Sequence, residues 1–138
     1  MTEDIKKIAC DFAKSNPTSH LATVEDNKPR IRVMHCPRID SNLTVWFTTS
    51  AASDKVRQIM ANPDVALEFF DSGKMLKITG RATVLNDQAT KNELWEEDWI
   101  RYFEKGKEDP DYCIIKVNPV TAEYLDMNLD PMTAHHLL

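Results

Sequence analysis

Glycine is scarce in this chain, with three among 138 residues. Nucleotide- and dinucleotide-binding folds depend on glycine-rich turns such as GxGxxG or the P-loop, and neither motif is present. A GxSxG sequence, which marks the nucleophile of many hydrolases, is also missing. These absences argue against a dinucleotide-binding fold and against a serine hydrolase of that type.

Long apolar runs and an excess of positive charge are missing as well. No stretch is long and apolar enough to cross a bilayer, and the N-terminus lacks the basic, then apolar, pattern of a secretion signal. The formal net charge is −5, which argues against nucleic acid or an anionic membrane as the main partner. We therefore expect a cytoplasmic protein that binds neither nucleic acid nor membrane.

Cysteine is rare too. Cys10, Cys36 and Cys113 are widely spaced and odd in number, and they form neither a CxxC motif nor a recognisable disulfide framework. We expect buried, reduced thiols, as in a cytoplasmic protein. The four histidines lack metal-binding spacing with cysteine or carboxylate partners, so we predict no metal site and no catalytic histidine among His20, His35, His135 and His136.

What remains is a pattern of short strands with a few helices. It predicts one mainly β domain over residues 1–138, with a core at about 5–126 and a tail at 127–138 that has no clear period. Helices are expected at residues 2–15, about 53–61 and 87–105, and the second should bury Val56, Ile59 and Met60. Strands are expected at residues 21–24, 30–36, 43–49, 65–70, 75–85, 112–117 and 122–126. Gly80 predicts a bulge or a close approach of two backbones.

The expected third helix is rich in large apolar side chains. Leu94, Trp95, Trp99, Ile100 and Phe103 recur at helical spacing. Aromatic side chains in such a pattern are typical of a core or a subunit interface, and a platform for a cofactor is the alternative. A small domain cannot bury all of them, which favours association of two chains.

Side chains suited to an anion concentrate between residues 29 and 55. The strand at 30–36 alternates, so one face carries Arg30, Arg32 and Met34 and the other carries Ile31, Val33 and His35. Hydroxyls then precede the helix that has Lys55 in its first turn, and they belong to Thr48, Thr49, Ser50 and Ser53. Free N–H groups at a helix start, hydroxyls and two cations together predict a phosphate pocket.

The same residues have a simpler structural explanation. Ser53 is a good N-cap whether or not it binds a ligand, and Thr48 and Thr49 are good strand formers. Many helix starts look like this one, so the local chemistry leaves both interpretations open.

The order of several short segments adds information that none of them carries alone. Arg-x-Arg-Val-Met (30–34), Trp-Phe-Thr-Thr (46–49), Ser-Asp-Lys-Val-x-Gln-Ile (53–59) and Asn-Pro-Asp-Val-Ala-Leu (62–67) follow one another, and the match continues through Leu-Lys-Ile-Thr-Gly-Arg-Ala (76–82) to Ala-Glu-Tyr (122–124). Over residues 5–126 the chain resembles the pyridoxamine-phosphate-oxidase-like flavin-binding family, most of all its general-stress-protein branch. The resemblance implies a split β-barrel, a homodimer, and FMN bound at the subunit interface.

The resemblance also implies roles for particular residues. Arg32 and Lys55 would bind the FMN phosphate, and Ser53 would supply a hydroxyl hydrogen bond. Val33 and Met34 would bring backbone groups against the ring. Phe47 and Thr48 would line the ribityl and phosphate end, and Thr49 belongs to the same cofactor-binding set. No catalytic side chain is expected, because the isoalloxazine ring itself accepts and donates hydride or electrons.

Four positions depart from the pattern of true pyridoxamine-phosphate oxidases. Those enzymes carry a lysine for the substrate phosphate where this chain has Pro37, and a C-terminal Arg-x-His that this chain lacks. They carry a glutamine where Met75 stands and a tryptophan where Leu125 stands. The first two departures argue against vitamin B6 oxidation, and the other two concern the fit of the flavin.

The resemblance thus implies a stress-related, flavin-dependent oxidoreductase of unknown substrate. A non-enzymatic protein that stores, buffers or senses flavin is the alternative, and a flavin-free descendant of the family is a third hypothesis. The predicted phosphate pocket favours the first two hypotheses over the third. Nothing in the sequence separates the first from the second.

Overall fold

A computed structural model describes residues 2–129 and 132–138. The chain forms helices and strands in the following order: α1 (Thr2–Ser15), β1 (Thr18–Glu25), β2 (Lys28–His35), β3 (Arg38–Ile39), β4 (Val45–Ser50), α2 (Asp54–Ala61), β5 (Asp64–Asp71), β6 (Lys74–Leu85), α3 (Gln88–Leu94), the 3-10 helices η1 (Glu97–Arg101) and η2 (Gly106–Glu108), β7 (Tyr112–Asp126) and β8 (Ala134–His136). None of the helices in the described residues is long and apolar enough to span a membrane.

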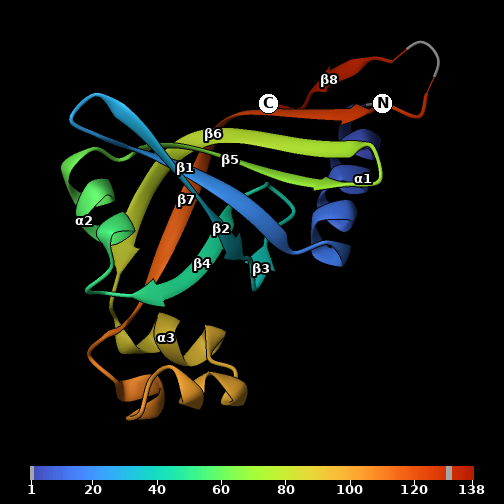
Figure 1. The fold of residues 1–138 in the computed structure, drawn as a ribbon. Coiled ribbons are helices and arrows are strands. Elements are labelled where there is room, and N and C mark those ends of the chain that lie inside the picture. Colours follow the sequence, from blue (N-terminus) through green and yellow to red (C-terminus); the bar gives the residue numbers. More distant parts are fainter. Residues whose placement is uncertain (1, 130–131) are drawn as a thin grey trace.

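The strands form one antiparallel sheet. Its order is β2-β1-β5-β6-β7-β4-β3, and β8 pairs with β7. Although β2 and β4 are far apart in this order, they approach each other in space, so the sheet curls around an apolar core (Figure 1). The core contains side chains from nearly every strand, the largest of them including Phe47, Phe69, Leu76 and Ile78.

Helix α1 agrees with its prediction. Ala9, Cys10 and Ala13 lie on its buried face, and Ile5 and Phe12 pack against the same core. Its end is fixed by Asn16, whose backbone N–H donates to Phe12 O at 3.0 Å before Pro17 stops the helix. The helix therefore closes the end of the sheet where β3 and β8 lie (Figure 1).

Residues 112–126 form one strand rather than the two that were expected. The pairing of β6 with β7 shifts between Thr79 and Gly80: Thr79 faces Thr121, Gly80 faces Pro119, and Val120 is the extra residue. The proline, which has no N–H to donate, therefore sits at a bulge where the ladder is already interrupted. A Cβ at Gly80 would overlap the carbonyl oxygen of Asn118, which confirms the predicted close approach of backbones.

The expected long helix at residues 87–105 is wrong. Helix α3 ends at Leu94, Trp95 is extended, and η1 and η2 follow. The breaks let the aromatic side chains gather around Tyr112, whose ring centroid lies 5.3 Å from that of Trp95 and 5.2 Å from that of Phe103. On one straight helix these rings would instead lie along a stripe. The second cluster that they form with Leu94 and Ile114 ties the helical segment to β7.

Two smaller expectations also need correction. The tail has structure within its described residues: β8 pairs with β7, and Leu137 is buried in the main core. In α2, Val56 and Ile59 are buried as expected, but Met60 is 73% exposed and Gln58 is buried in its place.

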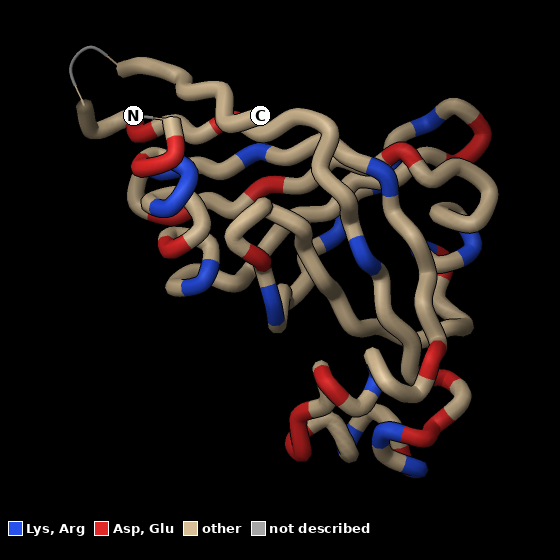
Figure 2. Tube along the Cα trace, turned by 180° about the vertical axis from the view of Figure 1, so that it is seen from behind, with Lys and Arg blue, Asp and Glu red and all other residues tan. Residues whose placement is uncertain are grey.

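The three cysteines are free and buried, as predicted. Figure 2 shows acidic and basic positions interspersed over the chain, with many acidic positions in the helical segment between β6 and β7.

Candidate functional site

The anion-binding residues predicted from the sequence meet where β2, β4 and the start of α2 come together. The predicted alternation of β2 is confirmed: Met34 is buried and Arg32 half-buried on one face, while Ile31 and Val33 are exposed on the other. The hairpin that carries β2 turns at Asp26 and Asn27, both of which have positive φ, as a two-residue turn requires.

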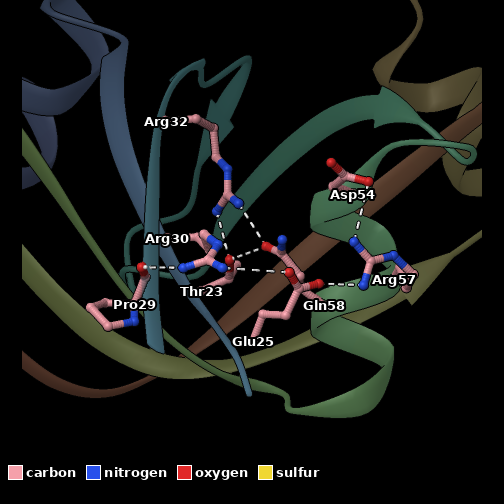
Figure 3. Close-up of polar contacts among 8 residues, drawn as sticks. All are labelled: Thr23, Glu25, Pro29, Arg30, Arg32, Asp54, Arg57 and Gln58. Carbon is pink, nitrogen blue, oxygen red and sulfur yellow. Dashed lines mark hydrogen bonds and ion pairs between the residues drawn. The ribbon is translucent and has the colours of Figure 1, made fainter. Parts of the chain in front are cut away.

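The side chain of Arg32 is fixed by neutral oxygen atoms. Its Nη1 donates to Thr23 Oγ1 at 2.8 Å, and its Nη2 donates to Gln58 Oε1 at 2.7 Å (Figure 3). Its Nη1 also donates to Leu21 O at 3.1 Å. None of these acceptors carries a formal charge. The guanidinium is therefore held in place without being neutralised.

Lys55 provides a second cation close by. Its Nζ donates to Thr49 Oγ1 at 3.0 Å. Burial lowers the pKa of Lys55, and the charge of Arg32 lowers it further, while burial also lowers the pKa of Arg32. None of the ion pairs in residues 2–129 and 132–138 includes either cation, and Asp54 pairs instead with Arg57 at 3.2 Å. Asp54 acts on both cations at longer range, but neither is in an ion pair within the described residues, and two neighbouring unpaired cations form a site that attracts an anion.

The state of the Ser53 side chain bears on the two interpretations of this helix start. Ser53 occupies the N-cap position of α2 with extended backbone, but its side chain makes no capping hydrogen bond. Its Oγ is the one side-chain nitrogen or oxygen in the described residues that is buried without a partner. Buried polar atoms are rarely left unsatisfied in native proteins. The missing capping bond does not fit an ordinary N-cap, and the hydroxyl is available to a ligand atom.

The loop that presents Ser53 is anchored by Asp111. Ser50 Oγ donates to Asp111 Oδ2 at 2.7 Å, and the backbone N–H of Ala52 donates to Asp111 Oδ1 at 3.1 Å. The backbone N–H of Ala51 donates to Asp111 O at 2.6 Å. These contacts join the loop between β4 and α2 to the start of β7 and hold the first turn of α2 in position.

A cleft of about 680 Å³ adjoins these groups. It is lined by the predicted residues Val33, Met34, Thr48 and Thr49, and by Ser50, one of the hydroxyls noted before the helix. Trp99 and Phe103, from the aromatic segment for which a cofactor platform was the alternative, also line it. The remaining lining residues were not predicted for the site, and they are His35, Arg101, Tyr102 and Asp111. Arg32, Ser53 and Lys55 are not part of its lining, but Lys55 reaches it through the hydrogen bond to Thr49. A cleft joined to a cationic corner suits a ligand with a flat body and a phosphate end.

Phe47 differs from the other predicted residues, because its side chain lies neither in the cleft lining nor beside the two cations. Its side chain has no exposed surface and lies in the core. The alternation of β4 explains this, because Val45, Phe47 and Thr49 point inward while Trp46, Thr48 and Ser50 point outward. The Phe47 side chain therefore faces the core, and the backbone of Phe47 is the part that would line a ligand site.

Thr23 and Gln58 are polar residues that sequence reasoning missed. Both are buried, and both contact Arg32. A signal for Gln58 existed in α2, since a residue between Val56 and Ile59 on an amphipathic helix can face the core. Thr23 carried no comparable signal, because threonine is common in strands. Residues 2–129 and 132–138 contain no cluster of His, Cys, Asp and Glu that would hold a metal ion.

The curled antiparallel sheet and its helices define a split β-barrel protein, as predicted. The chain belongs to the pyridoxamine 5'-phosphate oxidase like family, whose model matches residues 3–136.

Known proteins agree with this assignment. General stress protein 26 of Bacillus subtilis is 29% identical over 123 residues, which is 85% of each chain. The crystal structure of general stress protein 26 from Bacillus anthracis has a TM-score of 0.79 and 27% identity, over 89% of this chain and 95% of that one. An FMN-binding protein from Nostoc punctiforme shares the fold at 17% identity, with a TM-score of 0.75 over 95% of this chain and 86% of that one.

Proposed function

We propose that this protein binds FMN and acts as a flavin-dependent oxidoreductase on a substrate that is not yet known. The observation that carries the proposal is the buried, unpartnered Ser53 Oγ at the start of the helix that carries Lys55, a cation close enough to Arg32 to be affected by its charge. In this proposal the two cations and the hydroxyl hold the FMN phosphate, and the strand backbone at Val33 and Met34 lies against the ring. Bound FMN would supply hydride or electron transfer through its isoalloxazine ring.

The chain's own groups have a limited set of tasks in this proposal. Arg32 and Lys55 attract and orient the phosphate, and the free Ser53 hydroxyl donates to one of its oxygens. Thr48, whose side chain points outward from β4, lies in the cleft wall and would line the ribityl and phosphate end of the cofactor. Trp99, Tyr102 and Phe103 line the apolar side of the cleft and would cover the ring of a bound flavin.

A flavin titration tests the proposal. FMN fluorescence is measured at increasing protein concentration, with riboflavin, which lacks the phosphate, in parallel. We expect binding of FMN and much weaker binding of riboflavin. A protein that binds neither flavin, or binds both equally, contradicts a phosphate pocket at Arg32, Ser53 and Lys55.

We also infer that the protein is a homodimer with the flavin at the subunit interface. Ile31, Val33 and Tyr102 are 71%, 60% and 68% exposed, and the last two line the cleft. Exposed apolar side chains grouped beside a ligand site are typical of an interface. Sedimentation at micromolar concentration should give twice the mass of one chain, and a stable monomer would contradict the shared site.

A non-enzymatic role in flavin storage or sensing would use the same pocket, so binding alone does not distinguish it from catalysis. Steady-state assays with NADH or NADPH and an electron acceptor separate the two functions. Turnover well above that of free FMN supports an oxidoreductase. Turnover equal to that of free FMN supports a binding protein instead.

A further inference from the structure

Gln58 and Thr23 form a buried polar pair that neither the core nor the cleft explains. Gln58 is 4% exposed on α2, and Thr23 is 1% exposed on β1. Thr23 Oγ1 donates to Gln58 Oε1 at 2.5 Å. Placing two polar side chains at this depth is unfavourable unless their hydrogen bonds are made, and here those bonds lead to Arg32.

The hydrogen bonds run in one direction through the three residues. Arg32 Nη1 donates to Thr23 Oγ1, the Thr23 hydroxyl donates to Gln58 Oε1, and Arg32 Nη2 donates to the same Gln58 oxygen (Figure 3). Because two donors converge on Gln58 Oε1, the amide oxygen faces the guanidinium and the amide nitrogen faces away. The arrangement fixes the position of the guanidinium on two sides.

The acceptors that hold Arg32 are uncharged, and this affects how strongly the guanidinium can bind an anion. A carboxylate in the place of the Gln58 amide would have nearly the same shape but would pair with Arg32 and cancel its charge. Nearby carboxylates are already engaged, since Arg57 pairs with both Asp54 and Glu25 (Figure 3). The guanidinium is thus held firmly and still carries its full charge.

We propose that Thr23 and Gln58 are positioning residues that hold Arg32 with neutral oxygens, so that its charge remains available to the phosphate of the ligand. This inference rests on the proposed function, because the ligand is FMN. It explains why a buried helix position carries glutamine. Neither residue touches the phosphate itself, and both act through Arg32.

Gln58→Glu is the decisive variant, and Gln88→Glu on the exposed surface of α3 is the matched control. The dissociation constants of both variants and the parent are measured for FMN and for riboflavin, together with the unfolding temperature without flavin. For Gln58→Glu we expect FMN affinity to fall on the order of tenfold, while riboflavin affinity and the unfolding temperature do not fall. Gln88→Glu should match the parent in its affinity for both flavins, and any change in its unfolding temperature reflects the two hydrogen bonds that Gln88 Nε2 donates to Asn92 Oδ1 and Lys107 O.

The possible outcomes separate the hypotheses. If the parent binds FMN and Gln58→Glu binds it equally well, the positioning role is wrong and the proposed function stands. If FMN and riboflavin affinities fall together, Gln58 is only structural and the inference is again wrong. A parent that binds neither flavin overturns the proposed function and, with it, this inference.

A second pair of variants keeps the test decisive if Gln58→Glu does not fold. Thr23→Val removes the hydroxyl but keeps the shape, and Thr23→Ser keeps the hydroxyl. We expect Thr23→Val to lose FMN affinity relative to riboflavin and Thr23→Ser to retain it. Equal FMN affinity in these two variants contradicts the role of the hydroxyl.

Discussion

Lys55 Nζ and Thr49 Oγ1 lie 3.0 Å apart, and this hydrogen bond joins the first turn of α2 to the inner face of β4. It uses one of the three protons of the ammonium group and leaves two for other acceptors. Because Thr49 is buried, the bond also fixes where the ammonium lies. Lys55 is therefore positioned before any ligand arrives, which reduces the entropy lost on binding.

Lys55→Ala and Arg32→Ala should each weaken FMN binding. A charge-assisted hydrogen bond contributes about 1.5–3 kcal/mol, so we expect a loss of about ten- to a hundredfold in affinity. Fluorescence titration with FMN measures the effect, and the exposed Lys14→Ala on α1 serves as the control. Unchanged affinity in both site variants would place the phosphate elsewhere.

Lys55 should also make stability depend on pH in a predictable direction. Burial lowers its pKa in the folded protein below the usual lysine value, so the unfolded chain binds more protons between the two values. Flavin-free parent protein therefore carries a stability penalty from Lys55 at neutral pH. The penalty is relieved as pH rises through the lowered pKa.

The test of this penalty is Lys55→Met. We expect the variant to unfold at a higher temperature than the parent at pH 7, and we expect the difference to shrink toward pH 10. Comparing the two proteins at each pH removes the effect of all other lysines. If the two unfolding temperatures are equal at pH 7, or if their difference grows with pH, Lys55 is well solvated in the folded protein.

The sequence predicted strands more accurately than helices. Alternation along β2 and β4 follows from a period of two, and residues such as Arg32 and Val33 fall where that period places them. The helix at 87–105 was wrong because apolar spacing at Leu94, Trp95 and Trp99 also fits short helical pieces folded around Tyr112. Nothing local in the sequence indicates that Tyr112 lies at their centre.

The site could be predicted only in part, because a sequence pattern shows local chemistry but not the contacts that the tertiary fold creates. Arg32, Ser53 and Lys55 belong to segments that are close along the chain, and their chemistry was visible there. Thr23 and Gln58 act through contacts between β1, β2 and α2, which only the three-dimensional fold creates. The unpartnered state of the Ser53 hydroxyl likewise depends on tertiary burial and cannot be read from the residue type.

The cysteines should be unreactive while the protein is folded. Burial raises the pKa of the Cys36 and Cys113 thiols to about 11 and also raises that of Cys10, so very little thiolate forms at pH 8. A chromogenic disulfide reagent should react slowly with the native protein and with three thiols in denaturant. Ser41→Cys, at an exposed turn, provides a fast-reacting control. Rapid reaction of the native parent would contradict the burial.

Gly80→Ala should destabilise the protein strongly. The added Cβ would overlap Asn118 O, which belongs to the backbone of β7 and cannot rotate away. We expect a loss of at least about 2 kcal/mol in the free energy of unfolding, measured by urea denaturation. Thr83→Ala, at an exposed position of the same strand, should change stability by less than about 0.5 kcal/mol. Similar losses of unfolding free energy in both variants would mean that the backbone at the bulge rearranges to make room for the added Cβ.

Oxidation of pyridoxamine phosphate should be negligible even with FMN bound. A second phosphate placed near the flavin phosphate needs cations of its own, and Pro37, where the oxidases have lysine, provides neither a charge nor a backbone donor. Arg38 is the neighbouring cation, but it is occupied. Its Nε donates to Asp40 at 2.7 Å, its Nη1 donates to Glu93 at 3.0 Å, and its guanidinium stacks over Trp46.

Two carboxylates thus already neutralise the one side chain that would replace the missing lysine. Releasing Arg38 for a substrate phosphate would break both ion pairs and the stacking contact, and it would leave Asp40 without one of its hydrogen-bond donors. The assay measures pyridoxal phosphate formed from pyridoxamine phosphate and oxygen, with free FMN as the blank and with bound FMN verified by absorbance. We expect a rate far below the turnover of on the order of 1 s⁻¹ or more that is typical of enzymes. A rate in that range would show that Arg38 leaves its two carboxylates to bind the substrate.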